Sequence, residues 1–389
     1  MALFQQKLLP LFDIIATLTM ANSSKRIGYI DALRGLTMLL VVFSHIYLPN
    51  QTPLNQLFIH FRMPLFFFIS GFISFRREQS WSGLDTTSRL RSKVRTMIFP
   101  ALIIGVVYTL IANEVPLVEF FVRPAKLGYW FTFALFNMLV FYYIARFLHA
   151  RRGRTSIETF SKRFYIFGLL GFILLSDLSA LGNVVNVLTL GKTFEYLQYF
   201  AFGALCNCNR ASFERVLDDG RKMAIIVLGY FIISWWLIAS DDYVASLNPD
   251  NEPLLDRLIP ILNSLLTALV GYFGIMTVYG LFRRFGEFFS TNRVVGKPLQ
   301  YVGRNTLDVY LIHYFVLINF TPLLRPYIVD TTNILTQLVV GLTTAAAIVA
   351  VSLLIAKIIR LSDHLAYYLL GARDISLKSS NTIEHNPEN

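Results

Sequence analysis

The chain has 389 residues, of which 55% are hydrophobic, 15% aromatic and only 15% charged. Soluble domains carry about 25% charged residues, so this composition argues against a soluble enzyme and indicates a polytopic membrane protein. A net charge of +11 would suggest nucleic acid as a partner of a soluble protein. Here the positive charge is concentrated in alternate loops, the pattern of membrane topology, so we expect a lipid bilayer and no nucleic acid as partner.

The two ends of the chain differ from the hydrophobic region between them. Residues 1–24 lack the charged start and the small-residue cleavage site of a signal peptide. We interpret them as an N-terminal extension that need not be native, since Met20 offers a second start. Residues 25–373 are expected to form one membrane domain, and the polar residues 374–389 a disordered cytoplasmic tail.

The hydrophobic segments predict an all-α fold with about ten transmembrane helices. The expected spans are residues 28–48, 57–75, 96–112, 129–147, 164–178, 194–206, 223–239, 258–282, 304–321 and 335–359. The fifth and sixth are short for a hydrocarbon core about 30 Å thick.

Loop charge predicts the orientation of these spans. Lys and Arg are concentrated in four loops, at 76–95, 146–163, 207–222 and 283–304, whereas the loop at 240–257 is acidic. The positive-inside rule places the four basic loops in the cytoplasm, and ten spans then place both termini there as well. The expected location is the inner (cytoplasmic) membrane, crossed many times.

The first span carries charged residues on one face. An arginine at the centre of a bilayer costs at least about 2.5–3.5 kcal/mol, so a partner or ligand is expected to offset the charge of Arg34. Eleven residues at about 100° each place His45 on the same face, about 16 Å away along the axis. Asp31 and Arg34 are either a structural ion pair or part of a catalytic group. In the second case Arg34 contacts an anionic ligand and His45 is a general base near the outer surface.

The second span begins with a polar turn. His60 and Arg62 lie near the outer surface, at the level of His45, and are candidates for binding the substrate. Pro64 is expected in the first turn of the helix. Ser70 and Gly71, at mid-depth, are expected to allow another helix to approach closely.

Four cations precede the third span: Arg89, Arg91, Lys93 and Arg95. They are either solvated charges of a cytoplasmic loop or a set of groups that bind phosphates at the cytoplasmic face. The sequence leaves both interpretations open.

Three further residues are candidates for substrate binding. Trp130 opens the fourth span, either as part of an aromatic belt or as a stacking platform. Asp308 lies inside the ninth span at about the depth of Arg34, and a contact between the two is expected. His313 lies five residues later, about 140° around the helix, and so faces another way. Cys206 and Cys208 are expected to be free thiols, and no metal is expected.

Four segments together resemble the acyltransferase-3 family of transmembrane acyltransferases. The matching sequences are RIGYIDALRG at 26–35 followed by His45 in an Arg-x10-His spacing, PLFFFISGF at 64–72, Trp130-Phe131, and Leu311-Ile312-His313. The resemblance covers about residues 25–360, and ten helices is the family count. The branch most similar is the fucose-4-O-acetylase-like one, which has no fused extracytoplasmic domain.

The resemblance implies transfer of an acyl group, usually acetyl, from cytoplasmic acyl-CoA to a hydroxyl of a cell-surface glycan or its lipid-linked precursor. By analogy, Arg34 contacts the CoA part of acetyl-CoA, and His45 activates the acceptor hydroxyl. The family often has an Arg-x-x-Arg pair before the third span. Here Arg91 and Arg95 are four residues apart with Lys93 between them, so all three are candidates for binding CoA.

Relatives often carry a histidine two residues before the Pro-Leu-Phe-Phe motif, where this chain has Arg62. No Ser-His-Asp triad is apparent, so direct transfer is expected, with a covalent acyl-histidine as the alternative. Two other classes of protein fit the residues alone. A transporter or exporter of a small anion or glycan also needs intramembrane charges. A structural membrane subunit would tolerate His45→Ala.

Overall fold

The computed structural model describes residues 27–46, 52–77, 81–112, 115–153, 156–176, 182–239, 253–328 and 333–372, without the side chains of 183, 253–257 and 318–328. The expected N-terminal extension and C-terminal tail lie outside these residues. All regular structure within them is helical, which confirms the all-α prediction.

Ten helical segments correspond to the ten expected spans. They are α2 (Gly28–Ile46), α3 (Pro53–Ser74), α4 (Gly83–Lys93) continued by η1 (Val94–Ile98) and α5 (Phe99–Ala112), α7 (Trp130–Arg152), α8 (Ile157–Leu175), α10 (Leu190–Cys208), α12 (Gly220–Ala239), α14 (Pro253–Arg284), α17 (Thr306–Ile328) and α18 (Ile334–Ile359). Shorter helical segments connect them: α6 (Leu117–Val122), η2 (Lys126–Gly128), α9 (Asn183–Val187), α11 (Arg210–Asp218), α15 (Gly286–Thr291), α16 (Gly296–Arg304) and α19 (Asp363–Leu370).

Seven helices of the described chain are long and apolar enough to cross a membrane, with α4 to α5 counted as one. Helices α8 and α10 are not among the seven, and α17 contributes only the shorter apolar stretch Thr306–Leu317. Ten crossings and two cytoplasmic termini therefore stay predictions.

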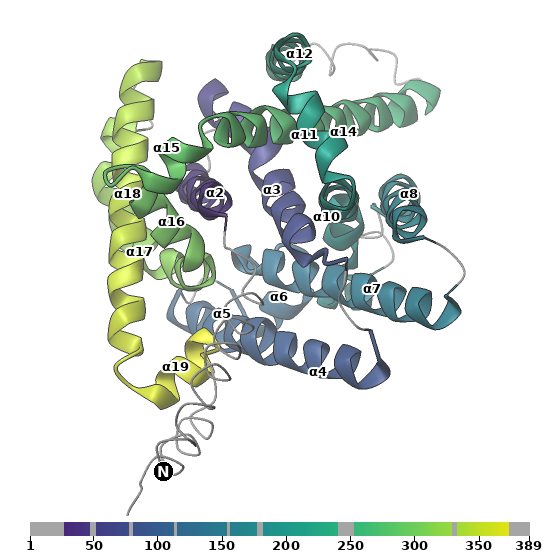
Figure 1. Cartoon of the computed structure of the whole chain (residues 1–389). Coiled ribbons are helices and arrows are strands. Elements are labelled where there is room, and N and C mark those ends of the chain that lie inside the picture. Colours follow the sequence, from purple (N-terminus) through teal and green to yellow (C-terminus); the bar gives the residue numbers. More distant parts are fainter. Residues whose placement is uncertain are drawn as a thin grey trace, which may run out of the picture.

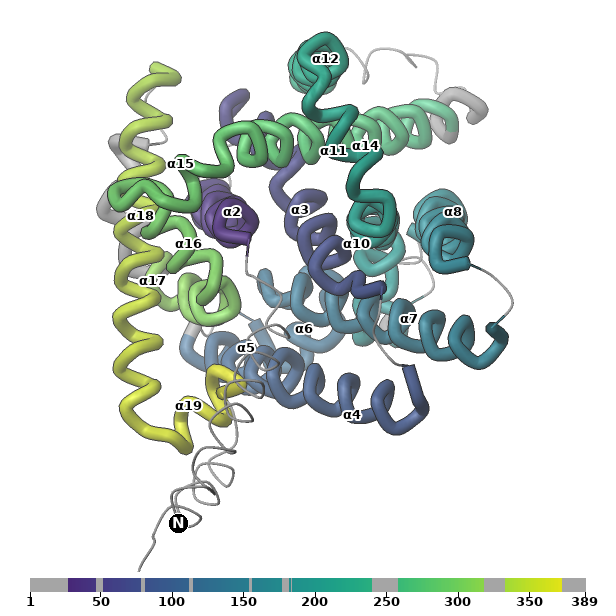
Figure 2. Tube along the Cα trace, in the orientation of Figure 1, coloured from purple at the N-terminus to yellow at the C-terminus, as the bar shows by residue number. Residues whose placement is uncertain are grey.

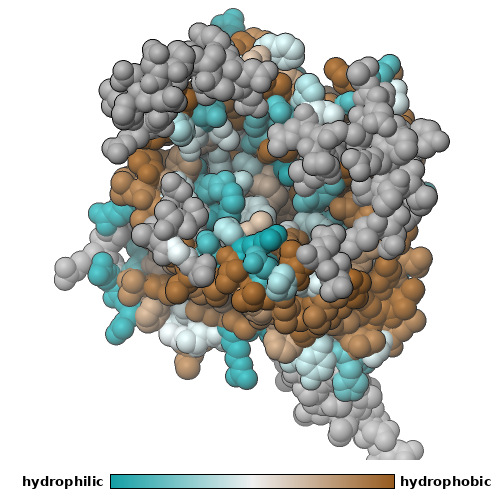
Figure 3. All heavy atoms as spheres, turned by 180° about the vertical axis from the view of Figure 1, so that it is seen from behind, coloured by the Kyte–Doolittle hydropathy of each residue, from teal (hydrophilic) through white to brown (hydrophobic). Residues whose placement is uncertain are grey.

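Figure 3 shows apolar residues across the lower part of the rear face and hydrophilic residues gathered in a recess near its centre.

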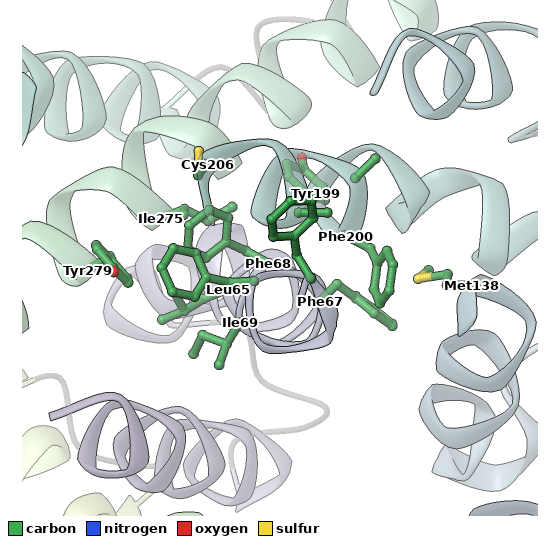
Figure 4. Packing of buried hydrophobic residues seen from close by; sticks show 14 of the residues in the cluster. Leu65, Phe67, Phe68, Ile69, Met138, Tyr199, Phe200, Cys206, Ile275 and Tyr279 are labelled. Atoms are coloured by element: carbon green, nitrogen blue, oxygen red, sulfur yellow. The ribbon is translucent and has the colours of Figure 1, made fainter. Parts of the chain in front are cut away.

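Helices α2 and α3 lie near the centre of the molecule and the other helices surround them (Figures 1 and 2). Helix α2 packs against α16, α18, α15 and α17, and α3 packs against α10, α14 and α2. The core is strongly aromatic: Phe67 and Phe68 of α3 pack with Tyr199 and Phe200 of α10 (Figure 4). This arrangement buries most of the first span, which carries the candidate catalytic residues.

Glycines set the closest helix crossings. A Cβ atom on Gly35 would overlap the carbonyl oxygen of Leu299, and one on Gly303 would overlap that of Asp31. Helices α2 and α16 therefore touch backbone to backbone. A Cβ atom on Gly71 would likewise overlap the carbonyl oxygen of Phe200, which confirms the close approach expected at this position. Small residues at membrane crossings permit such contacts.

Two expected helix starts are wrong. Helix α3 begins at Pro53, eleven residues before Pro64, which lies inside the helix. Pro53 takes the first-turn position because Thr52 caps the helix by accepting a hydrogen bond from the Asn55 backbone. His60 and Arg62 are consequently helical residues. The third span begins at Gly83 instead of 96, after a capping box formed by Ser82 and Asp85.

Candidate active site

A cavity of about 380 Å³ opens between α2, α3, the α4–α5 helix, α7, α17 and α19. Its polar end carries Arg34, Lys93 and Thr306. Its interior is lined largely by apolar side chains, among them Met38, Met63, Met97, Leu135 and Leu139. The cavity thus combines a cationic end with an apolar interior, which suits a ligand that has an anionic part and an uncharged arm.

Arg34 is held at this end by two neighbours. Its Nη2 atom donates a hydrogen bond of 2.9 Å to the Thr306 hydroxyl, and its Nη1 atom lies 4.0 Å from the Asp31 carboxylate. Asp31 is therefore a loose ion-pair partner, at the outer limit for a salt bridge. Lys93 is close enough to Arg34 to repel it electrostatically. Two cations that face one cavity are stabilised when an anion lies between them.

A local distortion of the helix precedes the third span's apolar part. Pro100 has no N–H group, and its ring clashes with the carbonyl four residues earlier in a regular α-helix. Residues Val94–Ile98 instead form a π-helical turn, in which the Phe99 N–H group bonds to the Val94 carbonyl five residues before it. Such turns are frequent at functional sites. This one contains Met97 and directly follows Lys93, both of which line the cavity.

His45 lies one helical turn beyond Val41, the last residue of α2 that lines the cavity. Its Nε2 atom is 3.0 Å from the Tyr314 hydroxyl. The centroid of its ring is 5.5 Å from that of His313. The structure therefore brings His45 and His313 together, although the sequence placed them 268 residues apart.

His313 has a defined tautomer. Its Nδ1 atom lies 3.0 Å from the Val309 carbonyl and 2.9 Å from the Tyr310 carbonyl. Because both of these groups only accept hydrogen bonds, Nδ1 carries the proton. The Nε2 atom is buried and has no hydrogen-bond partner in the described chain. His313 is fully buried, so this nitrogen is an unused acceptor in the wall behind His45.

The loop between α5 and α7 supports the far side of Tyr314. Tyr129 donates to the Leu311 carbonyl at 3.1 Å, and Tyr310 donates to the Gly128 carbonyl at 2.9 Å. Gly128 has a φ of 100°, and a Cβ atom there would overlap the Tyr314 hydroxyl. Glycine is needed here for its conformation and for the space that it leaves.

The predicted substrate residues of α3 and α7 lie on the same side as His45. Arg62 interacts electrostatically with His45, Tyr196 and Tyr314. Trp130 begins α7 as expected, and its ring lies 5.4 Å from that of Tyr196. His60 is partly buried on α3, two residues before Arg62.

An aromatic layer separates the cavity from His45. The ring centroids of Phe66 and Phe131 are 5.3 Å apart, and those of Phe131 and Tyr310 are 5.5 Å apart. All three rings line the cavity. On the other side, the Tyr310 ring lies 6.1 Å from His313. The site thus has two parts. We call the part with Arg34 and Lys93 the inner part and the part with His45 the outer part, after the orientation that the loop charges predict.

Several predicted residues take other roles. The expected contact of Asp308 with Arg34 is wrong, because Asp308 forms an ion pair of 2.7 Å with Arg360. Helix α18 ends beside the first turn of α17, which places Arg360 closer than Arg34. Arg95 donates to the Ala372 carbonyl at 3.0 Å and lies over the Tyr367 ring, so it holds the segment after α19.

The other candidate cations and the thiols are placed as follows. Arg91 is exposed, and Lys93 is the one member of the trio with Arg91 and Arg95 that lines the cavity. Cys206 and Cys208 are buried free thiols, as expected.

Sequence reasoning missed Thr306, Tyr310 and Tyr314. Tyr314 directly follows His313, and Thr306 stands at the first position of α17. Their position next to the motif residues could therefore have identified them as candidates. Their partners could not have been identified in this way, because each hydroxyl meets a helix that is far away in the sequence.

The described helices form an all-α membrane protein that encloses a candidate site with a cationic end and an apolar interior. The known family of acyltransferase domains matches residues 27–357, and the chain belongs to this family of membrane acyltransferases. The match does not separate the branches of the family, so the fucose-4-O-acetylase-like branch stays a prediction. No curated protein and no solved structure matches the chain.

Proposed function

We propose that the protein is an O-acetyltransferase of the inner membrane. It would move an acetyl group from cytoplasmic acetyl-CoA to a hydroxyl of a cell-surface glycan or its lipid-linked precursor. The observation that carries this proposal is the alignment of the two parts of the site along α2. Arg34 lies at the cationic end of the cavity, and His45 lies one turn beyond the last cavity residue of that helix.

The inner part suits the donor. The phosphates of CoA would bind at the cytoplasmic end, where Arg34 and Lys93 supply the positive charge. The uncharged arm of CoA would extend along the apolar lining toward Phe131 and Tyr310. Three methionines in this lining, Met38, Met63 and Met97, adapt easily to a flexible chain.

The outer part suits general base catalysis. With Nε2 of His45 donating to the Tyr314 hydroxyl, the ring is oriented and Nδ1 is left to accept a proton. Nδ1 would take the proton of the acceptor hydroxyl as its oxygen attacks the thioester carbonyl. The C–O bond forms, the C–S bond breaks, and the proton passes from His45 to the CoA thiolate. The aromatic layer must let the thioester reach His45.

The test is acetyl transfer from radiolabelled acetyl-CoA in inverted membrane vesicles, whose cytoplasmic face is outward, with glycolipids of the host as acceptors. His45→Ala should abolish labelling at unchanged protein level. His364→Ala, a matched control at an exposed position on α19, should label as the wild type does. Equal labelling by His45→Ala would rule out His45 as the base. If the wild type gives no label at any concentration of acetyl-CoA, this result would argue against acetyl-CoA as the donor.

A further inference from the structure

Arg62 is a charged side chain on α3, and no ion pair with a carboxylate of the described residues offsets its charge. Its Nε and Nη1 atoms are buried and have no hydrogen-bond partner in the part of the chain that the structure describes. An unpaired guanidinium inside a membrane protein is costly, and such residues are usually found where they bind a ligand or another charge. An anionic group is therefore expected to bind Arg62 at this position.

The groups that face Arg62 do not supply that anion. Its electrostatic neighbours are Tyr196 and Tyr314, together with His45. Glu195, next to Tyr196 in the sequence, is engaged by Lys192 in an ion pair of 2.6 Å. The outer part of the site consequently presents a guanidinium and two aromatic hydroxyl groups around His45.

The neighbouring wall is aromatic, with the ion pair of Lys192 and Glu195 beside it. The Lys192 Nζ atom lies 5.8 Å from the centroid of the Trp130 ring and 5.9 Å from that of Tyr196. Trp130 and Tyr196 in turn contact each other at 5.4 Å. A ligand bound beside Arg62 would therefore meet flat aromatic rings.

We propose that Arg62 binds an oxyanion that belongs to the acceptor, a carboxylate or a phosphate near the hydroxyl that receives the acyl group. This inference rests on the proposed function and narrows its substrate class to an anionic acceptor. The phosphates of the donor are assigned to Arg34 and Lys93 on the other side of the aromatic layer. The anion at Arg62 must therefore arrive with the acceptor.

The form of the side chain favours a group with two oxygens. A guanidinium is planar and binds carboxylate and phosphate through two parallel hydrogen bonds, one from Nη2 and one from either Nε or Nη1. In Arg62 both Nε and Nη1 have no partner in the described chain. The tetrahedral intermediate of acyl transfer develops negative charge on one oxygen only. A two-oxygen anion of the acceptor would pair with Nη2 and one of these two nitrogens and hold the hydroxyl at His45.

The kinetic test compares Arg62→Gln with the wild type on matched acceptors: a glycolipid that ends in a uronic acid, its neutral hexose analogue, and the same neutral sugar linked to polyprenyl diphosphate. The expected result is a rise of about tenfold to a hundredfold in KM for one anionic acceptor, with no change for the neutral glycolipid. The acceptor affected identifies the anion as carboxylate or phosphate. For that acceptor, the KM of Arg62→Lys should lie between those of the wild type and Arg62→Gln, since lysine keeps the positive charge but not the planar guanidinium.

Arg123→Gln is the matched control, because Arg123 has a carboxylate partner in Glu119 at 2.7 Å. It should leave every KM unchanged. An equal fall in kcat for neutral and anionic acceptors in Arg62→Gln would overturn the proposal and assign Arg62 to the tetrahedral intermediate. Unchanged kinetics with all acceptors would overturn it as well.

A binding measurement separates this inference from the proposed function. Thermal unfolding of the purified protein in detergent is followed with methyl glucuronide, methyl glucoside or inorganic phosphate. Methyl glucuronide should raise the Tm of the wild type and of Arg123→Gln, but not that of Arg62→Gln. Phosphate, which Arg34 and Lys93 would also bind, should raise the Tm of Arg62→Gln less than that of the wild type. This pattern without acyl transfer would support the oxyanion site and refute the transferase proposal. An equal shift with methyl glucoside, or no shift with any of the three, would refute the oxyanion site.

Discussion

The Nε2 atom of His45 lies 3.0 Å from the hydroxyl oxygen of Tyr314, so the predicted base on α2 is oriented by a side chain on α17. Tyr314→Phe removes this hydrogen bond and keeps the ring. We expect kcat of acyl transfer to fall about fivefold, because one oriented hydrogen bond is worth about 1 kcal/mol, while KM for acetyl-CoA stays constant. Steady-state kinetics in detergent measures both parameters.

A matched control for Tyr314→Phe is Tyr165→Phe. This change also deletes one contact between hydroxyl groups, that of Tyr165 with Tyr272 at 3.2 Å, but far along the chain from His45. Its kcat should equal that of the wild type. If Tyr314→Phe has the kcat of the wild type, the hydroxyl does not position His45.

The inner cations should act on the donor alone. Lys93→Gln and Arg34→Gln each remove one charge from the cavity, so KM for acetyl-CoA should rise about tenfold or more, as expected for a lost charged hydrogen bond. Arg91→Gln, at an exposed position outside the cavity lining, is the control and should change KM little. A larger effect at Arg91 than at Lys93 would mean that CoA lies outside this cavity.

The ion pair of Asp308 and Arg360 should stabilise the fold without entering catalysis. Asp308 is buried and Arg360 is half exposed. Loss of either partner is therefore expected to lower the free energy of unfolding by about 1–3 kcal/mol. Thermal unfolding of Asp308→Asn, Arg360→Gln and the double variant gives the coupling between them. Additive effects would show that the two side chains do not interact in the folded protein.

The crossing of α2 and α16 leaves no room for a methyl group. Gly303→Ala places a Cβ atom against the carbonyl of Asp31, and the helices must separate to admit it. We expect the free energy of unfolding to fall by about 1–3 kcal/mol, the usual cost of overpacking. We also expect a loss of activity because Asp31 and Arg34 move. Gly220→Ala is the control, since nothing lies within 4 Å of a Cβ atom there. Similar melting temperatures for both variants would contradict this packing.

Lys126 should make stability depend on pH. It lies in the loop between α5 and α7, is 2% exposed, and donates to the Phe121 and Asn186 carbonyls. Burial lowers the pKa of Lys126 from 10.5 to about 8. Between these two values the unfolded chain binds more protons than the folded one, so stability should rise with pH across that range.

Lys126→Met lacks this titration and provides the comparison. The difference in Tm between the wild type and Lys126→Met should shift in favour of the wild type from pH 7.5 to pH 10 (roughly the span between the two pKa values). A difference that is constant with pH would mean that the amine of Lys126 keeps an ordinary pKa.

Composition and hydropathy were enough to predict the class of the protein and the positions of its main helices. Long apolar segments must be helical in lipid because every backbone N–H and C=O group needs a partner within its own segment. For this reason the expected spans coincide with α2, α7 and α18 to within a few residues at the ends that the structure describes. The sequence also identified Arg34 and His45 as one face of a helix, since the period of 3.6 residues is local geometry.

The packing of the helices determines which side chains meet. Partners such as Tyr314 for His45, Thr306 for Arg34 and Arg360 for Asp308 come from other helices. Hydropathy does not encode the rotation and depth at which two helices pack. These are set by small contacts such as Gly35 and Gly303, where the backbones touch. The expected Asp308–Arg34 contact was wrong for this physical reason, because equal depth in the membrane does not imply adjacency.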